Sequence, residues 1–543
     1  MPRHREKLGT RNWKLETLYW LFQESPIPPR PAGLNALDLA VLVAYLAGIT
    51  LFGLRFRKRQ RSLKDYFLAD RNIPWWAIML SIVAAETSTL TIISIPGLAY
   101  RSDLTFLQVA LGYCVGRVVI SFLLIPHYFR GDLYTAYQLM ERRFGQRLRS
   151  LTASLFLITR SVAEGVRVFA VAIVVKITLG PLLAGLDPLT RDIVAIAIVT
   201  ALTVIYTLEG GMAAVIWTDV VQMFIYVGGT LVGFITLLQL VPGGWSEVAR
   251  VAGDAGKFRV FNFAPDIFQA YTFWAGLIGG AFLTTASHGT DQLIVQRLLA
   301  ARSERQSKTA LITSGFAVFA MFALFLILGV CLYVFYLRVE PGKTFESFDH
   351  IYPTFIVDHI SRATRWFPMA GLLIAAILAA AMSNLSAALN SLSSSSIVDF
   401  YLRRHPGASE ADRLRLSRVS TLLWAAVLFL LAIASRDIKV VVEVGLALAG
   451  VTYGALLGVF LLGVLTRTAN ERGTMVGLFC GFAFNLYLWQ EQNLWAWLRR
   501  PLGFSLALPQ ALPWTWYVPL GVMVTFAIGY AASLTLREES PHA

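Results

Sequence analysis

The sequence has few charged residues and only three cysteines, and both shortages exclude classes of protein. Charged residues make up 15% of the 543 residues, whereas 56% are hydrophobic and the mean hydropathy is +0.61. A soluble core cannot hide this much apolar surface, so a soluble globular protein is excluded. The cysteines Cys114, Cys331 and Cys480 all fall inside apolar segments, where we interpret them as packing residues and not as a disulfide framework.

The sequence also lacks the short motifs that mark common enzymes. It contains no nucleophile elbow, no phosphate-binding glycine loop and no cluster of metal-ligating residues, so we do not expect an enzyme. No stretch between apolar segments is long enough for a separate soluble domain. Only residues 536–543 follow the last segment, which argues against a sensor fused to a signalling domain.

Apolar segments, by contrast, recur along the whole chain. Each is about 20 residues or longer and can cross a hydrocarbon core about 30 Å thick. We predict an all-α polytopic membrane protein with about thirteen transmembrane helices. These are expected at residues 35–55, 75–100, 105–126, 151–178, 191–209, 212–241, 269–290, 309–337, 367–398, 418–434, 438–466, 473–490 and 513–536.

The net charge of +14 is concentrated in four basic loops, at residues 55–71, 130–149, 297–308 and 403–418. Each follows an odd-numbered segment, so all four are expected on one side of the membrane, which the positive-inside rule makes cytoplasmic. This predicts a plasma (inner) membrane protein with its N-terminus outside and its C-terminus in the cytoplasm. Anionic lipid headgroups, rather than nucleic acid, are the expected partner of the basic residues.

The first 34 residues do not fit this rule, because they are basic although they are predicted to lie outside. Acidic residues offset part of their charge, and the apolar run at residues 18–22 can form a short interfacial helix. We therefore treat residues 1–34 as a tail that lies on the membrane surface.

Two predicted helices contain polar sequence that a lipid-facing helix would avoid. Residues 84–89 place an acid, Glu86, and three hydroxyls in mid-membrane, and residues 284–291 are similarly polar. Irregular backbone at this depth is tolerated where it lines a cavity, and its freed carbonyls can coordinate a cation. The two helices begin successive sets of five, as expected of an inverted-repeat carrier. Polar packing between helices is the alternative, but an intramembrane acid favours an ion or solute path.

The helix predicted at residues 367–398 offers a further set of oxygen atoms. Ala380, Ser383 and Asn384 share one face at spacings of three and four residues. That face presents a carbonyl and two side-chain oxygens. Hard cations prefer oxygen ligands, and a dehydrated sodium ion takes about five, so we interpret this first turn as a candidate set of sodium ligands. Close packing of helices by small residues is the alternative, and it accounts for most of the serine run that follows.

Between about residues 37 and 466 the sequence resembles the sodium:solute symporter family, which includes proline, sugar, sialic acid, vitamin and monocarboxylate carriers. The motifs that carry the resemblance are Tyr66-Phe67-Leu68-Ala69 with residues 72–76, Gly210-Gly211-Met212 with residues 217–222, residues 292–298, and Leu389-Asn390-Ser391. The resemblance implies sodium-coupled symport of a small organic solute by alternating access.

The resemblance also implies the LeuT-type fold, which is a five-plus-five inverted repeat. On this basis residues 35–56 form a first helix, residues 75–241 the first repeat and residues 269–466 the second. Residues 473–543 then contain two additional helices and a short tail.

Carried over residue by residue, the family's principal sodium site uses three backbone carbonyls and two side chains. These belong to Ala84, Thr87 and Ala380, and to Ser383 and Asn384. Asn384 departs from the usual serine or threonine, but its amide oxygen is still a sodium ligand.

A second sodium site, present only in some members of the family, would use Asp219 with Ser383 and Ser386. Ala387 stands where those members have a hydroxyl, so the sequence leaves the second ion undecided.

Charged residues in the predicted helix at residues 151–178 suggest an acidic solute. Arg160 and Glu164 are one turn apart and are expected to pair, which leaves Arg167 without a partner along the helix. In related sialic acid carriers an arginine on this helix binds the solute carboxylate, and guanidinium geometry suits that task. The partner of Arg167 is thus a solute carboxylate, Glu86 or Glu164. Another arginine, Arg117, lies at residues 105–126.

The candidate solute contacts follow from the two polar breaks and from this charged helix. They are Glu86, Thr89, Arg160, Glu164, Arg167, Thr285, Ser287 and His288.

Three other functions compete with sodium symport at this point. A carrier of the same fold can be coupled to protons, with Glu86 as the proton carrier. A channel also contains broken helices and intramembrane acids. A transport-derived sensor is the third, and we favour it and the channel less than the proton-coupled carrier. For all of them the expected partners are a small organic solute and the bilayer, with no obligate protein partner.

Overall fold

The structure is a computed structural model of the chain. It describes residue 34 and residues 36–57, 60–178, 183, 185–360, 368–436, 441–490 and 512–536. In these ranges the regular structure is helical apart from one isolated β-bridge between Ile73 and Ala301, which confirms the all-α prediction for this part of the chain. The predicted interfacial helix in the tail falls outside the described residues.

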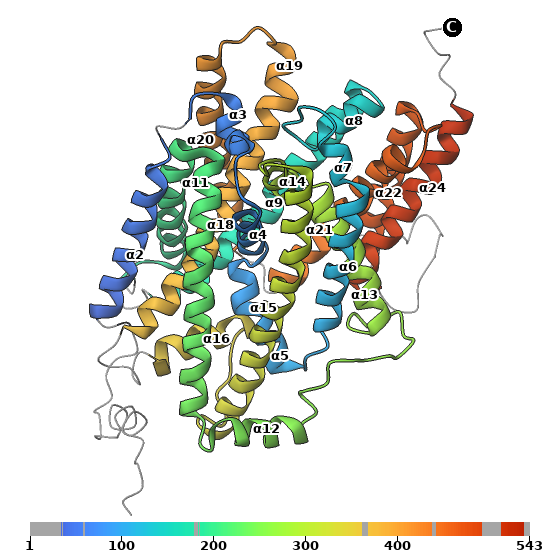
Figure 1. The fold of residues 1–543 in the computed structure, drawn as a ribbon. Coiled ribbons are helices and arrows are strands. Elements are labelled where there is room, and N and C mark those ends of the chain that lie inside the picture. Colours follow the sequence, from blue (N-terminus) through green and yellow to red (C-terminus); the bar gives the residue numbers. More distant parts are fainter. Residues whose placement is uncertain are drawn as a thin grey trace, which may run out of the picture.

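Every predicted apolar segment falls on a helix (Figure 1). The long helices are α2 (Ala36–Leu54), α4 (Trp75–Glu86), α5 (Thr89–Arg101), α6 (Leu107–Leu123), α9 (Gln146–Thr178), α11 (Pro188–Leu240), α13 (Phe273–Gly289), α15 (Glu304–Arg338), α18 (Met369–Ser395), α20 (Glu410–Ala434), α21 (Val441–Leu465), α22 (Glu471–Gln490) and α24 (Tyr517–Thr535).

Short helices connect them at the two ends of the bundle. They are α3 (Leu63–Leu68), α7 (Ile125–Tyr128), α8 (Tyr137–Arg143), α12 (Gly244–Asp254), α14 (Gln292–Leu299), α16 (Ile351–Phe355) and α19 (Leu402–Arg404), with π-helices at Ile356–Ile360 and Ser396–Tyr401.

Length and composition support a multi-pass membrane protein. In the described part of the chain, six helical stretches are long and apolar enough to cross a membrane, and the bent pair of α4 and α5 makes a seventh. One of the six, α11, spans two predicted segments. The count of about thirteen crossings therefore stays a prediction.

Gly211 separates the two predicted segments within α11. Its φ of 55° and ψ of −154° break the helix, and a Cβ atom here would come within 2.6 Å of the Tyr66 carbonyl oxygen. Only glycine combines this backbone conformation with so close an approach. The motif Gly210-Gly211-Met212 is thus a turn between two helical halves.

Helix α18 forms the centre of the bundle. It contacts α2, α4, α9, α11 and α20, and nearly all of its side chains are buried. Its many alanines and serines allow such close approach, because small residues let helix backbones pack tightly. The outer helix α20, in contrast, exposes Leu422, Leu423 and Leu430, which suits contact with lipid.

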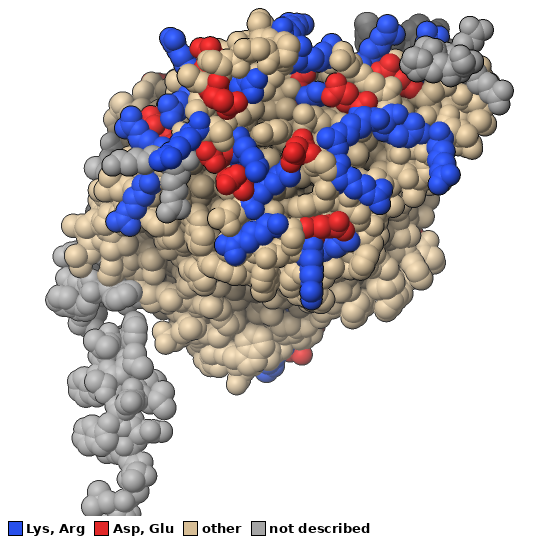
Figure 2. All heavy atoms as spheres, turned by 45° about the horizontal axis from the view of Figure 1, so that its top comes forward, with Lys and Arg blue, Asp and Glu red and all other residues tan. Residues whose placement is uncertain are grey.

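The basic loops gather at one end of the molecule. In Figure 1, α3, α8 and α19 lie at the upper end and α12 lies at the lower end. Figure 2 shows Lys and Arg side chains spread over the upper face, interspersed with a smaller number of acids. Three of the four basic loops therefore lie on one side of the fold, and the β-bridge between Ile73 and Ala301 brings the fourth beside the first.

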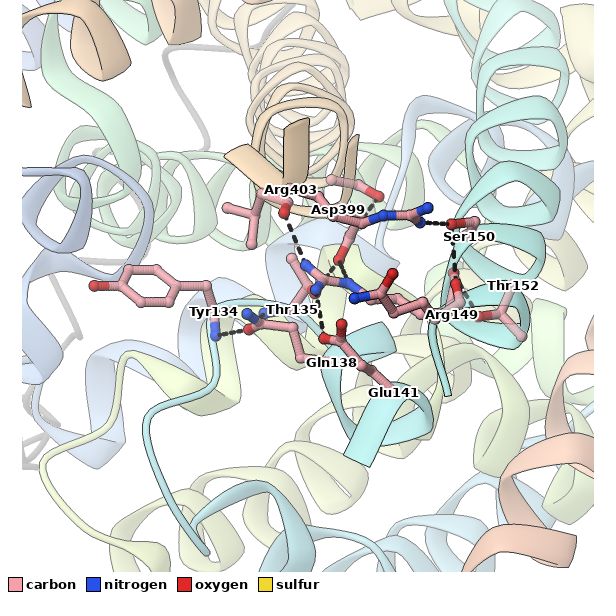
Figure 3. A network of polar contacts seen from close by, with 12 residues as sticks. Tyr134, Thr135, Gln138, Glu141, Arg149, Ser150, Thr152, Asp399 and Arg403 are labelled. Atoms are coloured by element: carbon pink, nitrogen blue, oxygen red, sulfur yellow. Dashed lines mark hydrogen bonds and ion pairs between the residues drawn. The ribbon is translucent and has the colours of Figure 1, made fainter. Parts of the chain in front are cut away.

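A polar network ties the π-helix that continues α18, Ser396–Tyr401, to α8 and α9 (Figure 3). Arg149 donates to Asp399 Oδ1 at 2.9 Å, to the Val398 carbonyl at 2.7 Å and to Glu141 Oε2 at 2.5 Å. Thr135 donates to Asp399 at 2.8 Å. Arg149 and Asp399 are both buried, so removing either one would leave the other charge buried without its main partner.

Candidate functional site

The predicted break in residues 84–89 is present. Helix α4 ends at Glu86, and the N–H of Ser88 donates to the Glu86 carbonyl at 2.9 Å instead of to Ala84, four residues back. Thr87 between them leaves helical geometry, with ψ at 81°. Helix α5 then starts at Thr89 in a new direction, and the two helices meet at 59°. The last carbonyls of α4 have no hydrogen-bond donor within the helix, as at any helix end, so they need partners from elsewhere.

The second predicted break lies between α13 and α14. Helix α13 ends at Gly289, and Asp291 caps α14 by accepting from the Leu293 N–H at 2.8 Å. The other carboxylate oxygen of Asp291 accepts from the Tyr453 hydroxyl at 2.7 Å. The polar residues at this break therefore combine helix capping with contacts to a helix far away in the sequence.

A cavity lies between the two breaks. The space open to water-sized molecules in it is about 160 Å³. One water needs about 10–15 Å³ by this measure, so the cavity has room for a small organic molecule. Five predicted solute contacts line it, namely Glu86, Arg160, Arg167, Ser287 and His288.

Other lining residues were not predicted as solute contacts. They include Ser88, Thr91, Tyr113, Thr284, Phe322 and Tyr453. Three predicted contacts are not among the described lining residues, and one of them, Glu164, is buried beside Arg160 and Arg167. The Thr285 hydroxyl donates to the Ala281 carbonyl of its own helix at 2.7 Å, and the side chain of Thr89 lies outside the described residues.

Glu86 is paired within the protein. Its carboxylate forms an ion pair with Arg117 of α6, and its Oε2 lies 3.3 Å from His288 Nε2. Ser287 Oγ lies 2.9 Å from the other ring nitrogen of His288. Arg117 is fully buried, and the sequence assigned it no role. Its charge in mid-membrane was the signal that a partner had to exist.

The charged pairs on α9 differ in part from the prediction. Arg160 Nη2 lies 3.3 Å from Glu164 Oε2, which confirms the predicted pair, and Arg160 also reaches Asp291 at 3.5 Å. The prediction that Arg167 has no partner along its helix is wrong, because its Nη1 lies 3.6 Å from the same Glu164 oxygen. Residues three apart are neighbours on a helix, so this contact was available from the spacing.

Arg167 is nevertheless more accessible than the other arginines at the cavity. Its side chain is 32% exposed, compared with 6% for Arg160 and 0% for Arg117. Its second contact, at 3.4 Å, is with Asn384 Oδ1 on α18. Both contacts are longer than the usual 2.7–2.9 Å of charge-assisted hydrogen bonds, so the guanidinium is held loosely.

The predicted sodium ligands lie at the C-terminal end of α4, with Thr87 just beyond it, and on α18, which packs against α4. Ala84, Thr87, Ala380, Ser383 and Asn384 are all buried. The atoms available as cation ligands are carbonyl, hydroxyl and amide oxygens, which hard cations prefer. Asn384 Nδ2 lies 3.5 Å from the Ala380 carbonyl, and Ser383 Oγ donates elsewhere, to Asp219, at 2.6 Å.

Asp219, predicted for a second sodium site, is already paired with a cation of the protein. Arg297 Nη2 lies 2.9 Å from Asp219 Oδ2, and Ser81 Oγ donates to the same oxygen at 2.5 Å. Ser386 donates to the Ser383 carbonyl at 2.9 Å. Arg297 lies in the motif at residues 292–298, and the sequence did not predict its role.

Most of the chain is similar in sequence to known proteins. The model of the sodium:solute symporter family matches residues 66–481. The sodium/sialic acid symporter SiaT of Proteus mirabilis is 31% identical over 450 residues, which cover 81% of this chain and 87% of that protein. The human sodium/iodide cotransporter is 28% identical, over 83% of this chain and 68% of that protein. Human sodium-coupled monocarboxylate transporter 1 is 27% identical, over 79% of this chain and 68% of that protein.

Solved structures show the same fold. A Na⁺-coupled sialic acid symporter in a substrate-bound, outward-open state superposes with a TM-score of 0.77 at 28% identity, over 92% of this chain and 98% of that one. Mhp1, a nucleobase-cation-symport-1 family transporter, has a TM-score of 0.52 at 12% identity, over 88% of this chain and 94% of that one. At this identity the likeness is one of fold alone.

Proposed function

The chain belongs to the sodium:solute symporter family, and from this premise we propose that the cavity between the two helix breaks binds a carboxylate-bearing organic solute. That the chain is a sodium-coupled transporter, and not an enzyme, follows from the family and was predicted from the sequence.

One observation carries the choice of an anionic solute: Arg167 presents an accessible, loosely held guanidinium to the cavity. Its protein partner Glu164 is shared with Arg160, which makes the shorter contact. A solute carboxylate can accept two parallel hydrogen bonds from a guanidinium, which Glu164 does not do here. The names of the relatives also point to anions, because they are transporters of sialic acid, monocarboxylates and iodide.

For sodium we propose the carbonyls of Ala84, Thr87 and Ala380 with the side chains of Ser383 and Asn384. The end of α4 and one face of α18 supply these oxygens, and all five residues are buried. Since α4 and α18 belong to different proposed repeats, an ion between them would resist their separation.

The first prediction is that uptake requires sodium and that Ser383→Ala weakens the binding of the ion. We expect the sodium concentration for half-maximal uptake to rise about tenfold, because one ligand oxygen is lost. Uptake of radiolabelled sialic acid and of short monocarboxylates into proteoliposomes, with sodium or potassium at constant pH, measures this.

Ser391→Ala is the matched control for that variant. Ser391 is buried on the same helix and donates to the Ala388 carbonyl at 3.0 Å, so its loss should leave the sodium dependence unchanged. Equal uptake in potassium would contradict sodium coupling. A saturable uptake of neutral or cationic solutes, with none of the anions transported, would contradict the proposed solute class.

We further propose that one sodium ion is carried per cycle. The carboxylate that a second ion needs, Asp219, already has Arg297, Ser81 and Ser383 as partners. A buried arginine supplies the positive charge there, and Ala387 offers no hydroxyl to an additional ion.

The second prediction follows from this stoichiometry. Uptake of a singly charged carboxylate with one sodium moves no net charge, so its rate should not depend on the membrane potential. Proteoliposomes with a potassium gradient and valinomycin measure this, with and without an inside-negative potential. A several-fold faster uptake at negative potential would indicate a second sodium and contradict the role given to Arg297.

The same premise supports proposals about architecture and placement. We propose that residues 75–241 and 269–466 are the two inverted repeats, because each begins with a helix broken at a polar segment. We propose that the basic face in Figure 2 is cytoplasmic, that the N-terminus is outside and that the protein resides in the plasma membrane. Proton coupling through Glu86 finds no support, since Arg117 neutralises that carboxylate.

A further inference from the structure

Arg167 contacts residues of both proposed sites. It lines the solute cavity, and its Nη1 lies 3.4 Å from the amide oxygen of Asn384, a proposed sodium ligand. We propose that Arg167 couples the two sites: without solute it holds the Asn384 oxygen, and an anionic solute draws it away and releases that oxygen to sodium. This inference rests on the proposed function and adds a coupling residue to it.

The geometry next to Asn384 favours such an exchange. The residues that line a second, small cavity of about 10 Å³, with room for about one water, include Ser88, Asn384, Glu164 and Arg167. Arg167 lines both this small cavity and the solute cavity. A shift of its guanidinium toward the solute cavity therefore changes the surroundings of the Asn384 amide directly.

Arg167 is also better able to move than the fully buried arginines. Its two contacts, at 3.4 and 3.6 Å, are long, and its side chain is partly exposed. Arg297, in contrast, is buried and donates to Ser81 at 2.8 Å and to Asp219 at 2.9 Å. A solute carboxylate that offers two short hydrogen bonds can therefore compete with Asn384 for Arg167.

Two effects couple the sites. A guanidinium bound to Asn384 Oδ1 uses a lone pair that sodium needs, and its positive charge repels the ion. An anion that withdraws and neutralises the guanidinium removes both obstacles, so solute strengthens sodium binding. Coupling is reciprocal, so sodium bound at Asn384 would in turn free Arg167 for the solute.

The third prediction concerns sodium binding in the absence of any solute. Arg167→Gln should tighten it by about 5- to 10-fold, in the usual range of coupling between sites. In an Asn384→Ser background the same change should have a clearly smaller effect, because the shorter serine does not reach Arg167 and only the loss of charge repulsion remains. The measurement is the sodium-dependent rise in melting temperature of purified protein, with sodium chloride replacing potassium chloride at constant ionic strength, checked by direct binding of radioactive sodium.

Lys176→Gln is the matched charge control. It removes a positive charge from the same helix, where Lys176 pairs with Asp192 at 2.8 Å, and it should leave sodium affinity unchanged. Should Arg167→Gln not fold, Arg167→Lys replaces it. Lysine keeps a positive charge next to Glu164 but is too short to contact Asn384 as arginine does. Sodium binding should therefore become tighter in this variant too.

The outcomes separate this inference from the proposed function. Unchanged or weaker sodium binding in the Arg167 variants would overturn the coupling role. Equal tightening by Arg167→Gln with and without the Asn384→Ser substitution would also overturn it, since it would mean a general charge effect. Absence of sodium binding by the wild-type protein would instead reject the proposed sodium ligands themselves.

Discussion

Glu86→Gln is expected to abolish transport and to lower the free energy of unfolding by about 3–5 kcal/mol, because it leaves the guanidinium of Arg117 buried without a carboxylate. Arg117 is fully buried, and two of its nitrogens, Nε and Nη1, already lack a hydrogen-bond partner among the described residues. Glutamine can accept one hydrogen bond but carries no charge. Thermal or denaturant unfolding of purified protein, together with sodium-driven uptake, measures the two effects.

A double substitution distinguishes the charge pair from general damage at this position. Glu86→Gln with Arg117→Gln removes both charges, so it should recover most of the lost stability, whereas transport should stay low because the cavity wall has changed. Glu304→Gln is the control on a surface pair with Lys308 on α15, and it should not change the melting temperature measurably. A Glu86→Gln protein with wild-type stability and uptake would show that the pair has no role.

The second large effect is expected at Arg149. Arg149→Ala removes three contacts from the network in Figure 3 and leaves the buried Asp399 with hydroxyl donors, Thr135 and Ser395, in place of a cation. We expect a loss of about 3–5 kcal/mol in the free energy of unfolding. We also expect faster hydrogen exchange of the α8 amides, because the network joins α8 and α9 to the end of α18.

Arg142→Ala is the matched control for Arg149. Arg142 is a neighbouring arginine that donates to the Arg130 carbonyl in an exposed position, so its removal should have little effect on stability or exchange. Equal losses in the two variants would mean that the network in Figure 3 contributes nothing particular to stability. Asp399→Asn tests the same pair from the acidic side and should resemble Arg149→Ala.

Some features of the site were predictable because they are properties of contiguous sequence. The break at Glu86 and the break before Asp291 follow from polar residues inside apolar segments, and both are present. The Arg160–Glu164 pair follows from helical spacing. The same spacing also places Arg167 beside Glu164, which is one of the three partners that the sequence left open for it.

The sequence by itself thus determined the membrane class, the helical segments, the broken helices and the clustering of basic loops, because hydropathy and helical periodicity act over neighbouring residues. Only the tertiary structure decided which charges meet. Glu86 and Arg117 are 31 residues apart, and Arg167 and Asn384 are 217 apart. Such pairs depend on how α4, α6, α9 and α18 rotate and pack against one another. In a medium of low dielectric constant a buried charge requires some partner, but which one it finds is a property of the packed bundle.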